Sequence, residues 1–263
     1  MAAKKHIVSA QLYTLREYTY SAKEIVKTMR KIRKIGYTSA QISAMAALDP
    51  AELRRLMTDE GVEPISAHVG LDQFADIPAV AAQCHGWGVK HVVIPYLPLD
   101  SVQTAASWKK VARQFSAYGK ALAKEGVVLL YHNHAFEFQK YGIRGGRGGQ
   151  VGLDILFENS DPRYLQSELD IGWVARGGHN PVTWAKKLKG RLDQVHVKDW
   201  GMLNHEPVWR AVGEGGIEWP AVIKACKASG TRYFIVEQDD CPITNDPFKS
   251  MQISFENLQA LGL

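Results

Sequence analysis

Apolar residues follow two alternating patterns along the chain: short runs rich in β-branched residues, and longer segments in which apolar positions recur at helical spacing. The short runs predict strands over residues 6–12, 37–43, 62–70, 89–96, 127–134, 164–172, 192–200 and 231–240. The longer segments predict helices over 21–35, 49–61, 76–88, 102–125, 152–159, 180–189, 217–229 and 247–261. Cap residues agree with these limits, since Gly36 follows the first helix and Asp49 with Pro50 begins the second.

Strands that alternate with helices predict a parallel sheet with right-handed crossovers. Eight strand-helix units within 263 residues fit a closed (β/α)8 TIM barrel better than an open doubly wound sheet. No Pro- or Ser-rich linker divides the chain, and 46% hydrophobic residues suffice for one large core. We therefore predict an α/β fold with a single TIM-barrel domain over residues 1–263.

Composition and charge indicate the cellular compartment and the class of ligand of this domain. The N-terminal apolar run is too short for a signal peptide, and no stretch approaches the roughly 18 apolar residues of a membrane span. Cys84, Cys226 and Cys241 are far apart and odd in number, which argues against a disulfide framework. These features predict a soluble, cytoplasmic protein. The net charge of +5 is spread over helical segments, which disfavours nucleic-acid binding and leaves anionic small-molecule substrates open.

Ionisable residues stand at the ends of the last three predicted strands. In a TIM barrel the carboxyl ends of the strands meet at one pocket, so Asp170, His196 and Glu237 are expected to converge there. Two buried carboxylates beside an imidazole need a compensating cation. The sequence therefore predicts a divalent metal site, and oxygen and nitrogen ligands suit Mn²⁺, Zn²⁺, Mg²⁺, Co²⁺ or Fe²⁺.

The fifth predicted strand supplies further candidates. By strand alternation His132 and His134 share one face, so one completes the metal shell and the other binds substrate or moves protons. Glu137 lies just past the strand as a ligand or base, or else as a solvated loop acid. Taken singly, the other residues also have structural alternatives, with His196 as a hydrogen-bonded core histidine and Asp170 as the cap of the next turn.

Seven motifs carry a family resemblance over the whole chain: SAQLYTLRE, ISAHVG, YHNHAFEF, ELDIGWVARGG, QVHVKDW, VGEGGIEW and FIVEQD. Through them the chain resembles the xylose isomerase-like TIM barrel superfamily, in its sugar phosphate isomerase/epimerase branch. The resemblance implies a divalent metal held by Glu, Asp, His and Glu, one from each of the last four strands. Asp170, His196 and Glu237 match the last three positions, and His132 stands where relatives have the first glutamate.

Other pocket residues follow from the same resemblance or from position. His68 ends the third strand and would contact substrate, although alone it is also a core histidine. Lys198 shares the strand face of His196, where it could stabilise an enediolate oxygen or neutralise a substrate charge, or else snorkel at the barrel rim. Candidates for binding hydroxyls, stacking or contacting anions are Gln11, Gln41, Trp173 and Arg210.

These residues predict a metal-dependent isomerase or epimerase that acts on a sugar, keto-sugar or related polyol through an enediolate. The catalytic candidates are Glu237, His134, Glu137 and Lys198. In the family's epimerases two metal-bound glutamates transfer the protons, so here His134 or Glu137 would act as the second base. If the enediolate expels a β-substituent, the enzyme is a lyase, a dehydratase or a glycoside-eliminating enzyme. The alternatives from other classes are an endonuclease IV-type nuclease and a non-catalytic sugar-binding barrel. A homo-oligomer is possible in every case.

Overall fold

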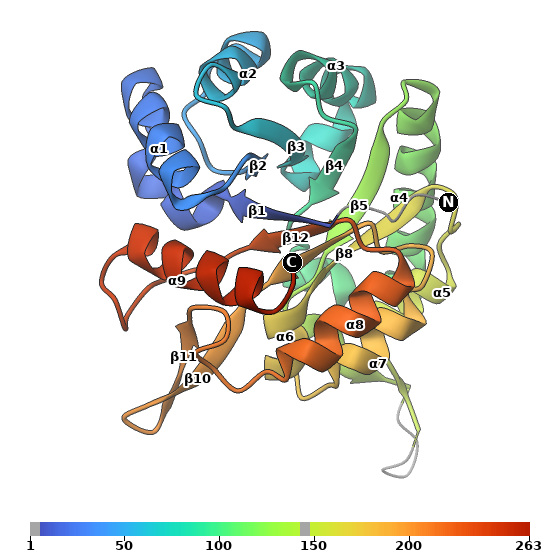
Figure 1. Ribbon diagram of the computed structural model, residues 1–263. Helices are drawn as coiled ribbons and strands as arrows, with labels where there is room; N and C mark the ends of the chain where they lie inside the picture. Colours follow the sequence, from blue (N-terminus) through green and yellow to red (C-terminus); the bar gives the residue numbers. More distant parts are fainter. Residues whose placement is uncertain (1–5, 143–147) are drawn as a thin grey trace.

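Eight parallel strands close into a barrel in the computed structural model, which describes residues 6–142 and 148–263 (Figure 1). The barrel strands are β1 (Ile7–Gln11), β2 (Ser39–Ile42), β3 (Glu63–His68), β4 (His91–Ile94), β5 (Val128–His132), β8 (Leu165–Asp170), β9 (Gln194–Val197) and β12 (Tyr233–Val236). They pair in chain order, and β1 closes the ring by pairing with β12. The predicted (β/α)8 TIM barrel is confirmed.

Helices connect the strands and surround the barrel (Figure 1). They are α1 (Ala22–Ile35), α2 (Pro50–Thr58), α3 (Ile77–Trp87), α4 (Ala105–Lys124), α5 (Gly152–Glu158), α6 (Ile171–Arg176), α7 (Pro181–Lys187), α8 (Trp219–Ser229) and α9 (Pro247–Ala260). Each predicted helix overlaps one of these, and α6 is an additional short helix directly after β8.

The first helix illustrates why the sequence forms these elements. The Ser21 side chain caps the N-terminus of α1 by accepting a hydrogen bond from the helix backbone. Ile25, Met29 and Ile32 recur at helical spacing and are fully buried, so one face of α1 packs on the barrel. Gly36, with a φ of 131°, ends the helix in a conformation that other residues rarely adopt.

Polar side chains fill the inside of the barrel below the strand ends. The buried members are Gln11, Gln41, Ser66, Glu168 and Gln194, which are hydrogen-bonded to one another. Branched apolar residues fill this space in most TIM barrels. Burial of polar groups is tolerated here because they satisfy each other's hydrogen bonds. The strands therefore carry a fixed polar layer beneath the mouth of the barrel.

A hairpin that the sequence did not predict follows the seventh barrel strand. The predicted strand continues to residue 200, whereas β9 ends at Val197 and the chain turns into β10 (Asp199–Leu203), which pairs antiparallel with β11 (Glu206–Arg210). The buried Asp199 carboxylate anchors the start of this hairpin, accepting hydrogen bonds from the Gly213 backbone N–H (2.9 Å) and from Trp219 Nε1 (2.7 Å). The hairpin projects from the barrel wall (Figure 1).

Short segments complete the chain. Short 3-10 helices are η1 (Leu12–Tyr18), η2 (Leu71–Ala75), η3 (Leu99–Val102) and η4 (Phe136–Phe138), and each lies in the connection after a barrel strand. Strands β6 (Lys140–Tyr141) and β7 (Gln150–Val151) pair antiparallel beside the segment 143–147, which lies outside the described residues.

The state of the cysteines and the character of the helices bear on two predictions made from the sequence. Cys84, Cys226 and Cys241 are all free thiols, in agreement with the prediction that they form no disulfide framework. Among the helices in the described part of the chain, none combines the length and the apolar character needed to cross a bilayer.

Candidate active site

Four of the predicted residues meet at the carboxyl ends of the barrel strands. His132 is the last residue of β5, Asp170 the last of β8, His196 lies in β9, and Glu237 directly follows β12. All four side chains are buried, and each offers a ligand atom within 4.8 Å of the ligand atoms of the others. We call these four residues the ligand cluster.

Strand register brings the ligand cluster together. Asp170 and His196 are direct partners in the pairing of β8 with β9. Glu237 is held beside β9 by its backbone N–H, which donates to the Val197 carbonyl at 3.2 Å. His196 Nδ1 then lies 3.0 Å from Glu237 Oε2, and His132 Nε2 lies 4.0 Å from Asp170 Oδ2.

The two oxygens of Asp170 have different environments. Oδ1 accepts a hydrogen bond from the Trp173 backbone N–H at 2.8 Å and so caps α6, which is the structural alternative raised by the sequence. Oδ2 is buried and accepts no hydrogen bond from any described residue, although Lys198 Nζ lies 3.5 Å away. Burial raises the pKa of Asp170 to about 7, against the charge of Lys198, which lowers it. A cation beside Oδ2 would relieve this burial penalty.

The histidines of the site differ in charge. Burial lowers the pKa of His196, but the carboxylates of Glu168 and Glu237 outweigh it and raise the value to about 10. Burial lowers the pKa of His132 to about 4, and the charge of His196 adds to the effect. Burial likewise lowers the pKa of His134 to about 2. His132 and His134 are therefore neutral imidazoles at neutral pH, the form in which histidine binds metals.

Lys198 occupies a buried cage of carboxylates and indoles. Its Nζ lies 2.8 Å from Asp239 Oδ2 and 2.9 Å from Glu237 Oε2. The ammonium also faces the rings of Trp173 and Trp209, 5.2 and 4.7 Å from their centroids. Burial alone would lower the pKa of Lys198, but Glu237, Asp170 and Asp239 together raise it, so the side chain is charged.

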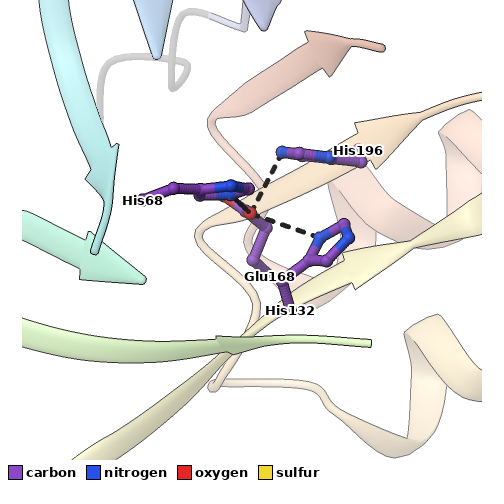
Figure 2. Close-up of side chains that lie close together, drawn as sticks. All are labelled: His68, His132, Glu168 and His196. Carbon is purple, nitrogen blue, oxygen red and sulfur yellow. Dashed lines mark hydrogen bonds and ion pairs between the residues drawn. The ribbon is translucent and has the colours of Figure 1, made fainter. Parts of the chain in front are cut away.

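Glu168 is a buried site residue that we did not predict from the sequence. Its Oε1 lies 2.7 Å from His68 Nε2, 3.0 Å from His196 Nε2 and 3.4 Å from His132 Nδ1 (Figure 2). Burial alone would raise the pKa of Glu168, but the surrounding histidines hold it well below its usual range. A signal was present in the sequence, because Glu168 is two residues from Asp170 and therefore faces the same side of its strand.

Three other predicted residues, His68, Gln11 and Trp173, lie beside or beneath the ligand cluster. His68 stacks on the His196 ring, with centroids 5.5 Å apart and planes at 13°. Gln11 donates through Nε2 to Gln41 Oε1 at 2.6 Å, and both amides are fully buried below the mouth. Trp173 faces Lys198 and packs edge-on against Trp209.

A cavity of about 330 Å³ opens beside the ligand cluster. Its lining residues are Tyr13, Ser43, Ala44, His68, Pro95, Tyr96, His132, His134, Glu237 and Asp239. The volume lies within the range of small-molecule sites. Glu237 and His132 thus join the cluster to a space that a substrate can enter, and we call this space the mouth cavity. His134 also lines it, and its buried Nδ1 has no hydrogen-bond partner among the described residues.

Two predicted residues lie apart from the ligand cluster. Glu137 is fully buried, accepting hydrogen bonds from the Tyr131 hydroxyl (2.7 Å) and from the His134 backbone N–H (2.9 Å). Burial raises its pKa to about 7. Arg210 lies on β11, where its guanidinium donates to the Met202 carbonyl at 2.8 Å. Neither side chain lines the mouth cavity.

The donor set of the ligand cluster fits a divalent metal ion. Two carboxylates and two imidazoles are all buried, with ligand atoms within 4.8 Å of one another, and Asp170 Oδ2 accepts no hydrogen bond from the part of the chain that the structure describes. Mixed oxygen and imidazole ligands suit first-row transition ions and zinc better than magnesium or calcium, which prefer oxygen alone. The cluster could therefore hold a metal ion, as the sequence predicted.

Comparison with known proteins places this barrel in a family. Residues 29–260 match the family model described as xylose isomerase-like TIM barrel. Inosose dehydratase 2 of Bacillus cereus is 24% identical over 249 residues, covering 86% of this chain and 76% of the relative. The matching curated proteins thus include a dehydratase, which is the alternative that the sequence left open beside an isomerase or epimerase.

Solved structures with the same fold carry different names. A sugar phosphate isomerase/epimerase from Parabacteroides distasonis superposes with a TM-score of 0.81 and 22% identity, covering 99% of this chain and 95% of that one. The IolI protein with a binding zinc atom superposes with a TM-score of 0.72 and 15% identity, covering 97% of each chain. At these identities the superpositions show the fold alone. Because the family model spans residues 29–260 and the closed barrel agrees with it, this chain belongs to the xylose isomerase-like TIM barrel family.

Proposed function

We propose that this protein is a divalent-metal-dependent lyase that removes the proton beside the carbonyl of a keto-sugar or keto-polyol and expels a β-hydroxyl or a larger β-oxygen substituent. The observation that carries the proposal is the placement of Lys198 Nζ between Glu237 Oε2 (2.9 Å) and Asp239 Oδ2 (2.8 Å), with both carboxylates lining the mouth cavity. One ammonium thus joins two carboxylates that a substrate can reach.

The proton transfers follow from this arrangement. The Glu237 carboxylate accepts the proton from the carbon next to the carbonyl, which leaves an enediolate. The leaving oxygen receives a proton from Lys198 Nζ, relayed by the Asp239 carboxylate, and the proton that Glu237 accepted passes to Lys198 Nζ, which contacts both carboxylates. The carbon-oxygen bond breaks as the carbon-carbon double bond forms, so the products are an unsaturated ketone and water or an alcohol. The net charge of the cage is unchanged at the end.

A metal ion held by His132, Asp170, His196 and Glu237 would supply Lewis-acid polarisation of the carbonyl oxygen. Residues of the chain that line the cavity would bind and orient the substrate. His134 is a neutral imidazole that lines the cavity, and a neutral imidazole can hydrogen-bond a substrate hydroxyl. His68 lines the same cavity and is fixed by its hydrogen bond with Glu168.

Isomerisation or epimerisation is the second candidate, and His134 is the residue that favours it. Reprotonation on the other face of the enediolate requires a second base, and the position expected for a second glutamate holds His132 instead. Of the remaining predicted bases, His134 lines the mouth cavity and Glu137 does not. His134 would return the proton in this alternative.

One experiment separates these reactions. The protein, loaded with Mn²⁺, Co²⁺ or Zn²⁺, is incubated in D₂O with a panel of keto-sugars and keto-cyclitols and followed by NMR and by ultraviolet absorbance. A lyase produces a conjugated ketone that absorbs in the ultraviolet, and a chelator abolishes it. Deuterium incorporation without loss of a substituent would favour the isomerase or epimerase. Binding with neither outcome would contradict both, and cleavage of abasic-site DNA would favour the nuclease instead.

A further inference from the structure

The Glu168 carboxylate lies beneath the ligand cluster and contacts three histidine rings and two glutamine amides. Its Oε1 faces His68, His196 and His132 (Figure 2), and its Oε2 accepts hydrogen bonds from Gln41 Nε2 and from Gln194 Nε2. An ionised carboxylate can only accept hydrogen bonds. Every side chain in contact with it must therefore present a donor.

This constraint fixes the orientation of the Gln41 amide. Gln41 donates through Nε2 to Glu168 Oε2 (2.5 Å) and to Ser66 Oγ (2.8 Å). Its carbonyl Oε1 must then point the other way, where it lies 2.7 Å from His196 Nε2 and accepts from Gln11 Nε2. A flipped amide would place Nε2 against the Gln11 donor and Oε1 against the Glu168 carboxylate.

The orientation of Gln41 in turn fixes His196. Its Nε2 faces two acceptors, Gln41 Oε1 at 2.7 Å and Glu168 Oε1 at 3.0 Å, so this nitrogen must carry a hydrogen. The other nitrogen, Nδ1, lies 3.0 Å from Glu237 Oε2 on the side of the ligand cluster. In the metal-free protein Nδ1 donates its own proton to Glu237 Oε2, so a cation that displaces this proton binds the Nδ1 lone pair.

His132 shows the same arrangement more loosely. Its Nδ1 lies 3.4 Å from Glu168 Oε1, an ion-pair distance without a hydrogen bond among the described residues, and its Nε2 lies 4.0 Å from Asp170 Oδ2. A hydrogen on Nδ1 directs the Nε2 lone pair toward the ligand cluster. Both histidines thus turn one nitrogen to Glu168 and the other to the cluster.

We propose that Glu168 is a positioning residue that, together with Gln41, determines which ring nitrogen of His196 and His132 faces the bound metal. The inference rests on the metal site of the proposed function. Carboxylates that hold the outer nitrogen of a metal-binding histidine fix the tautomer and ring orientation, and their loss weakens metal binding about 10- to 100-fold. Here one carboxylate serves two histidines.

A competing arrangement would make Glu168 itself a ligand. His68, His132, Glu168 and His196 also bring ligand atoms within 4.8 Å of one another. This group would use the opposite nitrogens of His132 and His196, which face hydrogen-bond acceptors, and Glu168 Oε2 is already taken by two amides. The positioning role needs no change in these contacts, whereas a metal in this group would displace them.

The first test is Glu168→Gln, which keeps the shape of the side chain and removes its acceptor-only character. The new amide donor opposes Gln41 Nε2, so the Gln41 amide turns and presents Nε2 to His196. The proton that the His196 ring keeps on metal binding is then the one on Nδ1, on the metal side. We expect the Kd for Zn²⁺, measured by chelator competition, to rise about 10- to 100-fold. The visible spectrum of the Co²⁺-loaded protein should change as well.

A double variant supplies the rescue. Glu168→Gln combined with Gln41→Glu exchanges the carboxylate and the amide, which restores an acceptor at His196 Nε2. Gln194 can turn its Oε1, which has no hydrogen-bond partner within the described chain, toward the new amide. We expect the double variant to recover most of the Zn²⁺ affinity and the original Co²⁺ spectrum. The control is Gln166→Glu, since the Gln166 amide bonds to the Pro162 carbonyl at the opposite end of the same strand and should leave both unchanged.

A third measurement needs no variant. In the Zn²⁺-loaded wild-type protein, nitrogen-15 NMR should find His196 protonated at Nε2 and metal-bound at Nδ1, and the reverse assignment would overturn the inference. So would a Glu168→Gln protein with wild-type Kd and spectrum, or two equivalents of bound Zn²⁺ of which this change removes one. If the wild-type protein binds no divalent metal at all, the proposed function fails first, and the two failures are thereby distinguished.

Discussion

The ammonium of Lys198 lies 2.9 Å from Glu237 Oε2, while Glu237 Oε2 is also 3.0 Å from His196 Nδ1. Glu237 Oε2 therefore contacts both the charged Lys198 and His196, which belongs to the ligand cluster. A metal ion and Lys198 compete for the same carboxylate, so the two sites are electrostatically coupled. This coupling determines how stability and chemistry should respond to changes at either site.

Lys198→Met should lower kcat by at least about 100-fold, because Glu237 and Asp239 lose the proton donor that they share. The same change should destabilise the metal-free protein by about 3–5 kcal/mol, since buried carboxylates lose their partner. Saturating Mn²⁺ should reduce that destabilisation, because the metal neutralises the same carboxylates. Denaturant unfolding with and without Mn²⁺ measures the effect, and an equal loss in both conditions would contradict the coupling.

Asp170 has two roles, and two substitutions should separate them. Asp170→Asn keeps an oxygen that can cap α6 through the Trp173 N–H, so the unfolding temperature of the metal-free protein should change little. Asp170→Ala loses the cap and should cost a further ~1 kcal/mol. Both should lose most of the bound metal, as determined by elemental analysis. Retention of stoichiometric metal in both variants would remove Asp170 from the ligand set.

Metal binding should strengthen as pH rises. The Glu168 and Glu237 carboxylates raise the pKa of His196 to about 10, so near neutral pH the metal displaces a proton from this residue. Burial raises the pKa of Asp170 to about 7, so its ligand oxygen is also better available above that pH. Calorimetry of Zn²⁺ binding in buffers with different ionisation enthalpies should detect the released proton. An affinity that stays constant from about pH 6 to about pH 9 would argue against these assignments.

The same raised pKa makes a prediction for the metal-free protein. The pKa of His196 in the folded state, about 10, is above its ordinary value of 6.5, so the charged form is favoured by folding. Its contribution to stability is complete below pH 6.5 and is lost as pH rises toward 10. His196→Asn should lack this slope, so the stability difference between wild type and variant should narrow between pH 6.5 and 10. A constant difference would mean that His196 is not charged there.

Glu137 should also make stability fall as pH rises, over a lower pH interval and without an effect on chemistry. Burial raises its pKa from 4.5 to about 7, so the unfolded chain loses this proton at lower pH than the folded protein does. The contribution of Glu137 to wild-type stability therefore falls as pH rises from 4.5 to 7, by up to ~3 kcal/mol. Glu137→Gln should remove this loss and gain stability relative to wild type over that interval, with kcat nearly unchanged. A large drop in kcat would restore Glu137 as the base that the sequence suggested.

The residues at the strand ends could be predicted because a TIM barrel places the carboxyl ends of all its strands around one pocket. Asp170, His196 and Glu237 each follow or end an apolar strand, and parallel strands in a ring present their carboxyl ends to one centre. Strand alternation turned both His132 and His134 to the same side, and the family resemblance singled out His132, which stands where relatives have the first glutamate. The prediction that these residues converge needed no side-chain detail.

Glu168, Asp239 and Trp209 could not be found in the same way. Glu168 lies one layer below the strand end, and the sequence does not tell whether an inward polar residue in a strand contacts the site or only a neighbouring amide. Asp239 lies in the loop after Glu237, where no periodicity constrains its direction. Trp209 reaches Lys198 only because a hairpin unseen in the sequence folds back over it. Tertiary packing determines how deep a side chain lies in the barrel and which way a loop runs, and neither can be read from the sequence pattern.

The Asp199 carboxylate ties the start of the β10–β11 hairpin to the backbone N–H groups of Gly213 and Gly215 and to the indole of Trp219. The base of this hairpin is thus anchored, while its far end, with Asn204 and His205 in left-handed conformations, is exposed. Because the anchor lies at the base, changes in the length or composition of the tip should leave the Trp209 indole in place over Lys198. The hairpin is accordingly a place where an engineer could graft new recognition elements at little cost to the chemistry below.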